Sequence, residues 1–129
     1  SLRLHCQGRL ICVLGCGGDR DPGKRSLMGV AAVQHSDLCL FTSDNPRSES
    51  PASIIDEMCR DLAVPLDPAD CLIDRKAAIQ RALTLQEPGD VVVILGKGHE
   101  RYQEIQGVRY PFNDEAIVTA ELMQRGRRA

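Results

Sequence analysis

Three charged segments that contain glycine are the places where this chain of 129 residues could do chemistry. They are residues 15–25 (GCGGDRDPGKR), 43–50 (SDNPRSES) and 96–101 (GKGHER). Glycine lets backbone amides approach a ligand closely, and Arg and Glu side chains bind carboxylate and ammonium groups. Because cations and anions stand side by side, the segments suit a zwitterion such as an amino acid better than a bare phosphate.

The first segment also offers a nucleotide-binding interpretation. Gly18 to Lys24 has the spacing G-x-x-x-x-G-K of a phosphate-binding loop, but Arg25 stands where Ser or Thr should bind magnesium. Two Asp residues inside the loop would repel a phosphate. The dinucleotide fingerprint G-x-G-x-x-G fails because Arg20 stands at its third glycine. A separate nucleotide-binding enzyme is therefore a weak alternative, and a solvated strand-to-helix turn stays open.

The second and third segments have plain structural interpretations beside the functional ones. Residues 44–47 (DNPR) are ordinary turn residues, and a simple turn would explain them. Alternatively, Pro46 stiffens the loop and presents Arg47, whose planar fork binds a carboxylate. Glu100 could accept from an ammonium group or be solvated, and a lone His99 is more often structural than a general base.

Alternating apolar strands and amphipathic helices are expected to position these segments. Ser50, Asp74 and Asn113 are candidate N-caps. The strands are apolar throughout, which is typical of a parallel sheet covered by helices on both faces. We expect strands at 9–14, 38–42 and 91–95, a third-strand candidate at 70–73, a hairpin at 102–105 and 108–110, and helices at 25–35, 51–62, 75–86 and 114–124.

Three helices carry apolar residues that are spaced like one helix face. These residues are Leu27, Met28, Ala31 and Ala32 in the first helix, Ile54, Ile55, Met58 and Leu62 in the second, and Ala78, Ile79, Ala82 and Leu83 in the third. The predicted fold is thus α/β, with a mostly parallel sheet and a small C-terminal hairpin. Ligands of such sheets bind beyond the carboxyl ends of the strands, so the three charged segments should converge there.

Composition excludes several classes of protein. Lys and Arg total 16 and Asp and Glu total 18, a net charge of −2 that argues against a nucleic-acid partner. No apolar run reaches membrane-spanning length and no signal peptide is evident, so we expect a cytoplasmic protein without a membrane partner. The six cysteines include no C-x-x-C pair, which favours reduced, buried thiols over a disulfide framework or a metal site.

Together, the segments GCGGDRDPGKRSLM (15–28), TSDNPRSESP (42–51) and GKGHERYQ (96–103) resemble the C-terminal domain of the Mur ligases. Within that family they resemble the members that add the third peptide residue to UDP-N-acetylmuramoyl-L-alanyl-D-glutamate. The likeness runs in order through nearly the whole chain. It implies that residues 1–129 are one Rossmann-like, amino-acid-binding domain of an enzyme of peptidoglycan synthesis.

The resemblance implies a division of labour between domains. The full enzyme is an amide ligase that uses ATP and Mg²⁺ and passes through an acyl phosphate. Its N-terminal and central domains, which hold UDP and ATP, are not in this sequence. The chain alone is therefore expected to lack ligase activity and catalytic residues, with Asp19 and Lys24 facing the nucleotide in the closed enzyme.

The D-N-P-R form of the second segment is associated in this family with meso-diaminopimelate as the incoming amino acid. The resemblance implies that Arg47 grips the distal carboxylate and that Asn45 hydrogen-bonds the same end. Lysine lacks that carboxylate, so a buried, unpaired Arg47 should reject it.

The remaining site residues follow from the same resemblance. Arg20 is expected to bind the carboxylate next to the attacking amine. The Gly96 carbonyl and Glu100 are expected to take the distal ammonium, with Asp44 as a weaker member. A free-standing, non-catalytic binding module of the same fold is the alternative.

Overall fold

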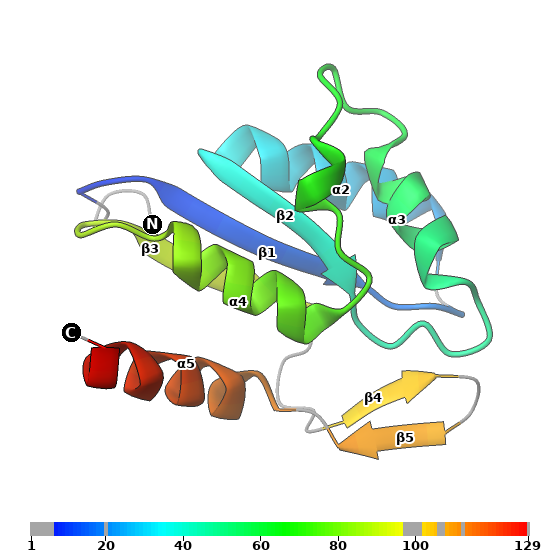
Figure 1. Cartoon of the computed structure of the whole chain (residues 1–129). Helices are drawn as coiled ribbons and strands as arrows, with labels where there is room; N and C mark the ends of the chain where they lie inside the picture. The colour runs from blue at the N-terminus through cyan, green and yellow to red at the C-terminus, as the bar shows by residue number, and fades with distance from the viewer. Residues whose placement is uncertain (1–6, 20, 97–101, 106–107, 112, 129) are drawn as a thin grey trace.

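A parallel sheet of three strands runs through the centre of the chain, in the order β2-β1-β3 (Figure 1). The strands are β1 (Leu10–Cys16), β2 (Leu38–Ser43) and β3 (Val91–Leu95). The computed structural model describes residues 7–19, 21–96, 102–105, 108–111 and 113–128. The predicted parallel sheet is confirmed, and both of its outer strands pair with β1.

The register brings the carboxyl ends of the three strands to one edge. Cys16, the last residue of β1, pairs with Ser43, the last residue of β2. Leu14 pairs with Leu95, which ends β3. The segments that leave these three strands therefore start close together in space.

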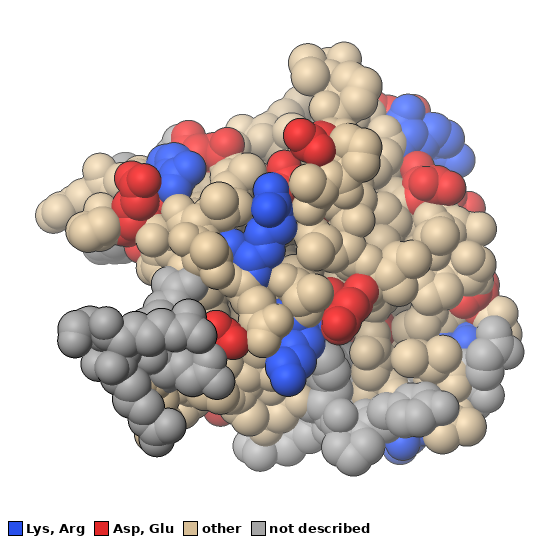
Figure 2. Space-filling view, in the orientation of Figure 1, with Lys and Arg blue, Asp and Glu red and all other residues tan. Residues whose placement is uncertain are grey.

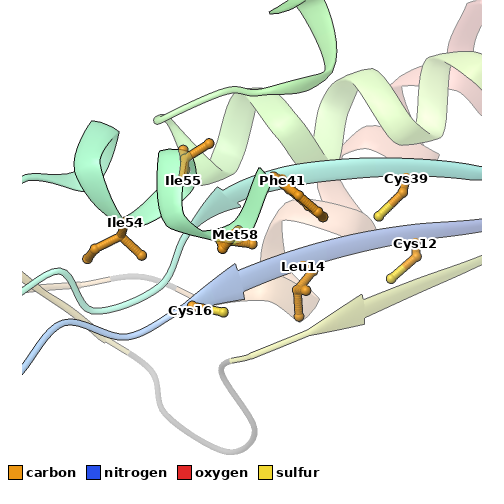
Figure 3. Close-up of a cluster of buried hydrophobic side chains, with 8 residues drawn as sticks. All are labelled: Cys12, Leu14, Cys16, Cys39, Phe41, Ile54, Ile55 and Met58. Atoms are coloured by element: carbon orange, nitrogen blue, oxygen red, sulfur yellow. The ribbon is translucent and has the colours of Figure 1, made fainter. Parts of the chain in front are cut away.

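Helices α2 (Gly23–His35) and α3 (Pro51–Cys59) cover one face of the sheet (Figure 1). Alternate side chains of β1 point to this face because successive residues of a strand face opposite sides. They form a buried cluster with side chains of β2 and α3 (Figure 3). Its members are Cys12, Leu14, Cys16, Cys39, Phe41, Ile54, Ile55 and Met58.

Helix α4 (Arg75–Leu85) covers the opposite face, so the predicted arrangement with helices on both faces is confirmed. Its predicted apolar face is buried as expected. The residues in this second cluster are Ile11, Val13, Leu40, Ala78 and Ala82. Helix α5 (Asp114–Arg128) packs along α4, where Gln80 Nε2 donates to Glu121 Oε1 at 2.9 Å.

A small antiparallel hairpin lies between the sheet and α5 in the sequence. It consists of β4 (Tyr102–Ile105) and β5 (Val108–Pro111), as predicted. Ile105 forms a parallel bridge with Arg47, so the hairpin meets the loop that follows β2.

The three predicted N-caps are confirmed. Ser50 Oγ accepts from the N–H of Ser53 at the start of α3. Asp74 Oδ1 accepts from the N–H of Lys76 at the start of α4, and Asn113 caps α5 in the same way. Each side chain satisfies a backbone donor that the first turn of a helix leaves unpaired.

The strand predicted at residues 70–73 is wrong. A 3-10 turn, η1 (Pro68–Asp70), precedes Cys71, which makes only an isolated bridge with Phe41. The N–H of Leu72 donates to the Phe41 carbonyl at 2.9 Å. Pro68 and the Asp67 cap favour the tight turn, so this segment touches the edge of β2 without continuing the sheet.

The face predicted for α2 is also wrong in part. Leu27 is 68% exposed and Met28 is 43% exposed, whereas Arg25, Ser26 and Gly29 are buried. A Cβ on Gly29 would overlap the carbonyl oxygen of Met58. The helix thus packs through its smallest residue, because α3 approaches too closely for a larger side chain.

Charge is mixed on the surface. Figure 2 shows acidic and basic side chains side by side on the face seen in Figure 1. No helix in the described part of the chain is long and apolar enough to span a bilayer.

Candidate functional site

The loops after β1 and β2 are joined by direct backbone contact. We call residues 17–22 loop one and residues 44–49 loop two. The N–H of Gly18 donates to the Asn45 carbonyl at 2.7 Å, and Arg47 Nη1 donates to the Gly18 carbonyl at 2.8 Å. Both polar groups of the Gly18 backbone are therefore taken by loop two. The predicted convergence of these two segments is confirmed.

A cavity of about 310 Å³ lies where the strands end. It brings together three residues from the predicted site: Lys24, Asp44 and Gly96. Asp44 is buried, and Lys24 is exposed at the first turn of α2. The full lining is Gly15, Cys16, Gly17, Asp21, Lys24, Arg25, Met28, Asp44 and Gly96.

Gly96 directly follows β3 and has a backbone conformation that requires glycine. Its φ is +118°, and a Cβ there would overlap the carbonyl oxygen of Gly15. An L side chain would be strained by the dihedral angle and would clash as well. The backbone of Gly96 is thus held close to the end of β1.

The hairpin fastens loop two from the other side. Gln103 Nε2, in β4, donates to Ser43 Oγ at 2.8 Å and to the Asp44 carbonyl at 2.7 Å. Because Arg47 also bridges to Ile105, two residues of β4, Gln103 and Ile105, hold loop two. Nothing in the local sequence around Gln103 indicates these partners, which lie about 60 positions away in the chain.

A buried arginine, Arg75, ties the strand ends to two helices. Arg75 has a fully buried side chain and donates to the carbonyls of Ser43 at 3.2 Å and Leu95 at 3.5 Å. Its Nη2 pairs with Asp114 Oδ2 at 2.8 Å. The carboxyl ends of β2 and β3 are thereby fixed to α4 and to the start of α5.

Comparison with known proteins identifies the family. The family model described as "Mur ligase, glutamate ligase domain" matches residues 1–98, which is most of the chain. The chain belongs to the Mur ligase family.

Individual relatives of this Mur ligase domain carry one name, UDP-N-acetylmuramoyl-L-alanyl-D-glutamate–2,6-diaminopimelate ligase. The protein of that name from Chromobacterium violaceum is 50% identical over 123 residues, which cover 94% of this chain and 24% of that protein. The one from Aquifex aeolicus is 50% identical over 118 residues, with coverage of 92% and 24%. The one from Xanthomonas oryzae is 46% identical over 125 residues, with coverage of 97% and 25%.

A solved structure with the same name has the same fold. It superposes with a TM-score of 0.87 at 40% sequence identity, and the match covers 97% of this chain and 26% of that one. The chain thus spans about a quarter of the length of the relatives it matches.

Loop two of the Mur ligase domain holds three of the predicted substrate residues. Asp44 lines the cavity, and Asn45 is fully buried with its carbonyl bonded to Gly18. Arg47 is half-buried, has a left-handed φ of +54° and bonds to the Gly18 carbonyl. Arg20 and Glu100 lie outside the described residues, so the structure says nothing of their positions.

The two residues that were expected to face the nucleotide, Asp19 and Lys24, have different surroundings. Lys24 lines the cavity, whereas Asp19 is exposed on loop one and accepts from Ser48 Oγ. Asp19 also has a left-handed φ, of +53°. Its contacts are therefore with loop two.

Among the described residues from Gly18 to Gly23, the backbone donors do not form a phosphate cradle. Gly18 N–H bonds to Asn45, Asp19 N–H to Glu49, and Gly23 N–H to Asp21 Oδ1 at 2.9 Å. A phosphate-binding loop needs such amides pointing at the ligand. The described residues of the 18–24 segment therefore do not fit a triphosphate, although the spacing of the segment resembles a P-loop.

Arg25 belongs to the candidate site although the sequence pattern did not indicate it. Arg25 was considered only as a misfit in the P-loop pattern, yet it is buried, lines the cavity and pairs with Glu49 and Glu57. The Arg25 guanidinium holds the pKa of the Glu49 carboxyl below its usual range. Arg25 stands between Lys24 and Ser26, so nothing in the local sequence indicated that it would be buried.

The cavity also contains a cysteine, Cys16. Burial raises the pKa of its thiol to about 11, against the opposing effect of the Arg25 charge. A thiol with that pKa is protonated at neutral pH and is a poor nucleophile. Cys16 is therefore a packing residue of the buried cluster, as Figure 3 shows.

Proposed function

We propose that this chain is the amino-acid-binding domain of an ATP-dependent ligase that adds meso-diaminopimelate to UDP-N-acetylmuramoyl-L-alanyl-D-glutamate in peptidoglycan synthesis. The names of relatives that are 46–50% identical across most of the chain support this proposal. In those relatives the matching part is about a quarter of the protein. The proposal therefore assigns to residues 1–129 one task within a longer enzyme.

The observation that carries the proposal is the position of the Arg47 side chain. Its side chain bonds to the Gly18 carbonyl, so the guanidinium is held between the two loops at the strand ends. A guanidinium offers a planar fork that matches a carboxylate. Diaminopimelate has a carboxylate at its far end and lysine does not, so an arginine fixed there would select between them.

The other assignments complete the proposed binding mode. Asn45 contacts the same distal end as Arg47, with Asp44 beside it. Arg20 binds the carboxylate next to the attacking amine. The Gly96 carbonyl and Glu100 accept from the distal ammonium. A site of this kind would orient the amine for attack on an acyl group that is activated by another domain.

Nucleotide chemistry is assigned to the rest of the proposed enzyme. The described part of loop one does not fit a triphosphate, since the backbone amides of Gly18 and Asp19 bond within the protein. We assign ATP and Mg²⁺ to the part that precedes this domain in the relatives' longer chains, with Lys24 and Asp19 facing the nucleotide on closure. By this proposal the isolated domain is inactive, and the reaction is cytoplasmic because it uses ATP and a UDP-linked precursor.

The test is ligation by the full-length protein that contains this chain. Assays with meso-diaminopimelate and L-lysine should show strong preference for the former. Arg47→Ala should raise the KM for diaminopimelate by about a hundredfold, because a charge-assisted bidentate contact is worth about 2–3 kcal/mol. Arg60→Ala is the matched control, since Arg60 is largely exposed and makes only long contacts, with Asp61 at 3.9 Å and with Ser26 Oγ at 3.4 Å.

Each other result has a clear meaning. Equal use of lysine, or an unchanged KM in Arg47→Ala, would contradict the assigned specificity. Binding of diaminopimelate by a full-length protein that ligates nothing would favour the non-catalytic binding module. ATP binding that depends on Lys24 within residues 1–129 alone would favour the separate nucleotide-binding enzyme.

A further inference from the structure

A single carboxylate connects α2, loop one and loop two. Glu49 Oε1 accepts from Arg25 Nη1 at 3.1 Å, and Glu49 Oε2 accepts from Arg25 Nη2 at 2.6 Å. Glu49 Oε2 also accepts the backbone N–H of Asp19. Glu49 therefore binds a side chain of the helix and the backbone of loop one at the same time.

Arg25 extends this connection to the other side of Gly18. Its Nη2 donates to the Gly17 carbonyl at 3.1 Å, and its side chain is only 3% exposed. Glu49 and Arg25 thus hold the residues on either side of Gly18. Gly18 itself is hydrogen-bonded to Asn45 and Arg47. Three consecutive residues, Gly17–Asp19, are therefore each held by a hydrogen bond.

The conformation of Asp19 shows why this fastening matters. Its left-handed φ of +53° costs of order 1–2 kcal/mol for a residue other than glycine. The Glu49 carboxylate accepts its N–H, and its own carboxylate accepts from Ser48 Oγ. Such a conformation persists only where the surroundings enforce it, and here both partners come from loop two.

A second carboxylate provides an internal comparison. Glu57, in α3, also pairs with Arg25, through Nη1 at 2.5 Å. The side chains of Glu49 and Glu57 are almost equally exposed, at 35% and 36%. Within the described residues, Glu57 makes no hydrogen bond to loop one. The two residues therefore share the neutralisation of Arg25 and differ in the contact with Asp19.

We propose that Glu49 is a positioning residue of the amino-acid site. It holds Gly17–Asp19 against Asn45–Arg47 before the ligand arrives, so that binding does not have to order the two loops. Affinity rises when such ordering is complete in the free protein. This inference rests on the proposed function, because it takes loops one and two to be the walls of that site.

The experiment compares Glu49→Gln with Glu57→Gln in the full-length protein. Each variant keeps side-chain size and leaves one carboxylate on Arg25, but only the first weakens the hold on Asp19. We expect Glu49→Gln to raise the KM for diaminopimelate about tenfold, with the KM for ATP changed less than about twofold. Glu57→Gln should change both constants less than about twofold, although the two variants should lose similar thermal stability.

The opposite pattern would overturn the proposal. If both variants raise the KM equally, or if neither does, Glu49 only neutralises a buried charge. Should Glu49→Gln fail to fold, Ser48→Ala takes its place, because it removes a bond to Asp19 and leaves Arg25 untouched. It should raise the KM for diaminopimelate about threefold, and an unchanged value would then count against the proposal.

A readout that does not depend on activity separates this inference from the proposed function. Hydrogen exchange of the peptide covering Gly17–Asp19 should accelerate in Glu49→Gln and stay slow in Glu57→Gln. If the wild type ligates no amino acid, the proposed function fails, while the exchange data still decide whether Glu49 orders loop one. Equal exchange in the two variants would contradict that ordering.

Discussion

Gly18 lies directly against the carbonyl group of Pro46, and a Cβ at position 18 would overlap that oxygen. The contact is between two backbones, so no flexible side chain can move aside. This close approach allows the N–H of Gly18 to reach Asn45 and brings its carbonyl to Arg47. The third glycine of the G-C-G-G segment, Gly18, is therefore required by the close approach of loop two.

Gly18→Ala should separate the two loops. We expect about 1–3 kcal/mol of lost stability from the overlap and at least a tenfold weaker affinity for diaminopimelate in the full-length protein. Thermal unfolding and ligand titration would measure the two effects. Gly23→Ala is the control, because a Cβ there would contact only the flexible Asp21 carboxylate, at 3.2 Å. Equal tolerance of both changes would contradict the role given to the Pro46 contact.

Arg75→Met should be strongly destabilising. It leaves Asp114 without its cation and removes the donors for the carbonyls of Ser43 and Leu95. Removing one partner of a buried ion pair costs about 3–5 kcal/mol. Urea unfolding would measure the loss. Arg81→Met, which breaks the more exposed pair with Asp70, should cost less than about 1 kcal/mol, and a similar cost for both would argue against the buried tie.

Asp90 should give the chain a pH-dependent stability. The backbone N–H groups of Arg9 and Glu87 donate to its carboxylate and hold the pKa of Asp90 below its usual range. Folding therefore favours the charged form. This contribution is complete above the unfolded pKa, about 4, and is lost as the pH falls through the lower folded pKa.

Melting temperatures of the wild type and Asp90→Asn would test this. The wild type should be the more stable at pH 6–7, and the difference should shrink below about pH 4. Asp61→Asn is the control, because Asp61 is 59% exposed and its pair with Arg60 spans 3.9 Å. A difference between wild type and Asp90→Asn that is constant from pH 3 to 7 would show that the charge of Asp90 is not involved.

Cys16 should resist alkylation in the folded protein. With a pKa of about 11, it has roughly two orders of magnitude less thiolate at pH 8 than an ordinary cysteine. Iodoacetamide labelling followed by peptide mass spectrometry should show slow modification at pH 8 that accelerates towards pH 10. Urea should make labelling at pH 8 fast. Fast labelling of the native protein at pH 7 would mean that Cys16 is a reactive thiolate.

Much of the local structure could be predicted because its causes lie within a few residues. The caps at Ser50, Asp74 and Asn113 act on donors two or three positions away, and all three are confirmed. The buried face of α4 follows from its own apolar spacing. The α/β order and the C-terminal hairpin were predictable for the same reason.

The location of the candidate site was also predictable in part. Apolar strands joined by helices run parallel, so the segments that follow them meet at one edge. The contacts between loops one and two confirm this for two of the three segments. The third segment lies largely outside the described residues. The roles of Arg20, Arg47 and Glu100 stay predictions that the proposed experiments can decide.

By itself, the sequence determined the order of elements, their caps and the edge at which the charged loops gather. Only the tertiary structure decided that Arg25 is buried and Leu27 exposed, reversing the apparent hydrophobic face of α2. The physical reason is that burial of a charge depends on its partners, and Arg25 finds Glu49 and Glu57 at 24 and 32 positions along the chain. Periodicity reports short-range preference, whereas pairing at such separations exists only once the strands have brought the loops together.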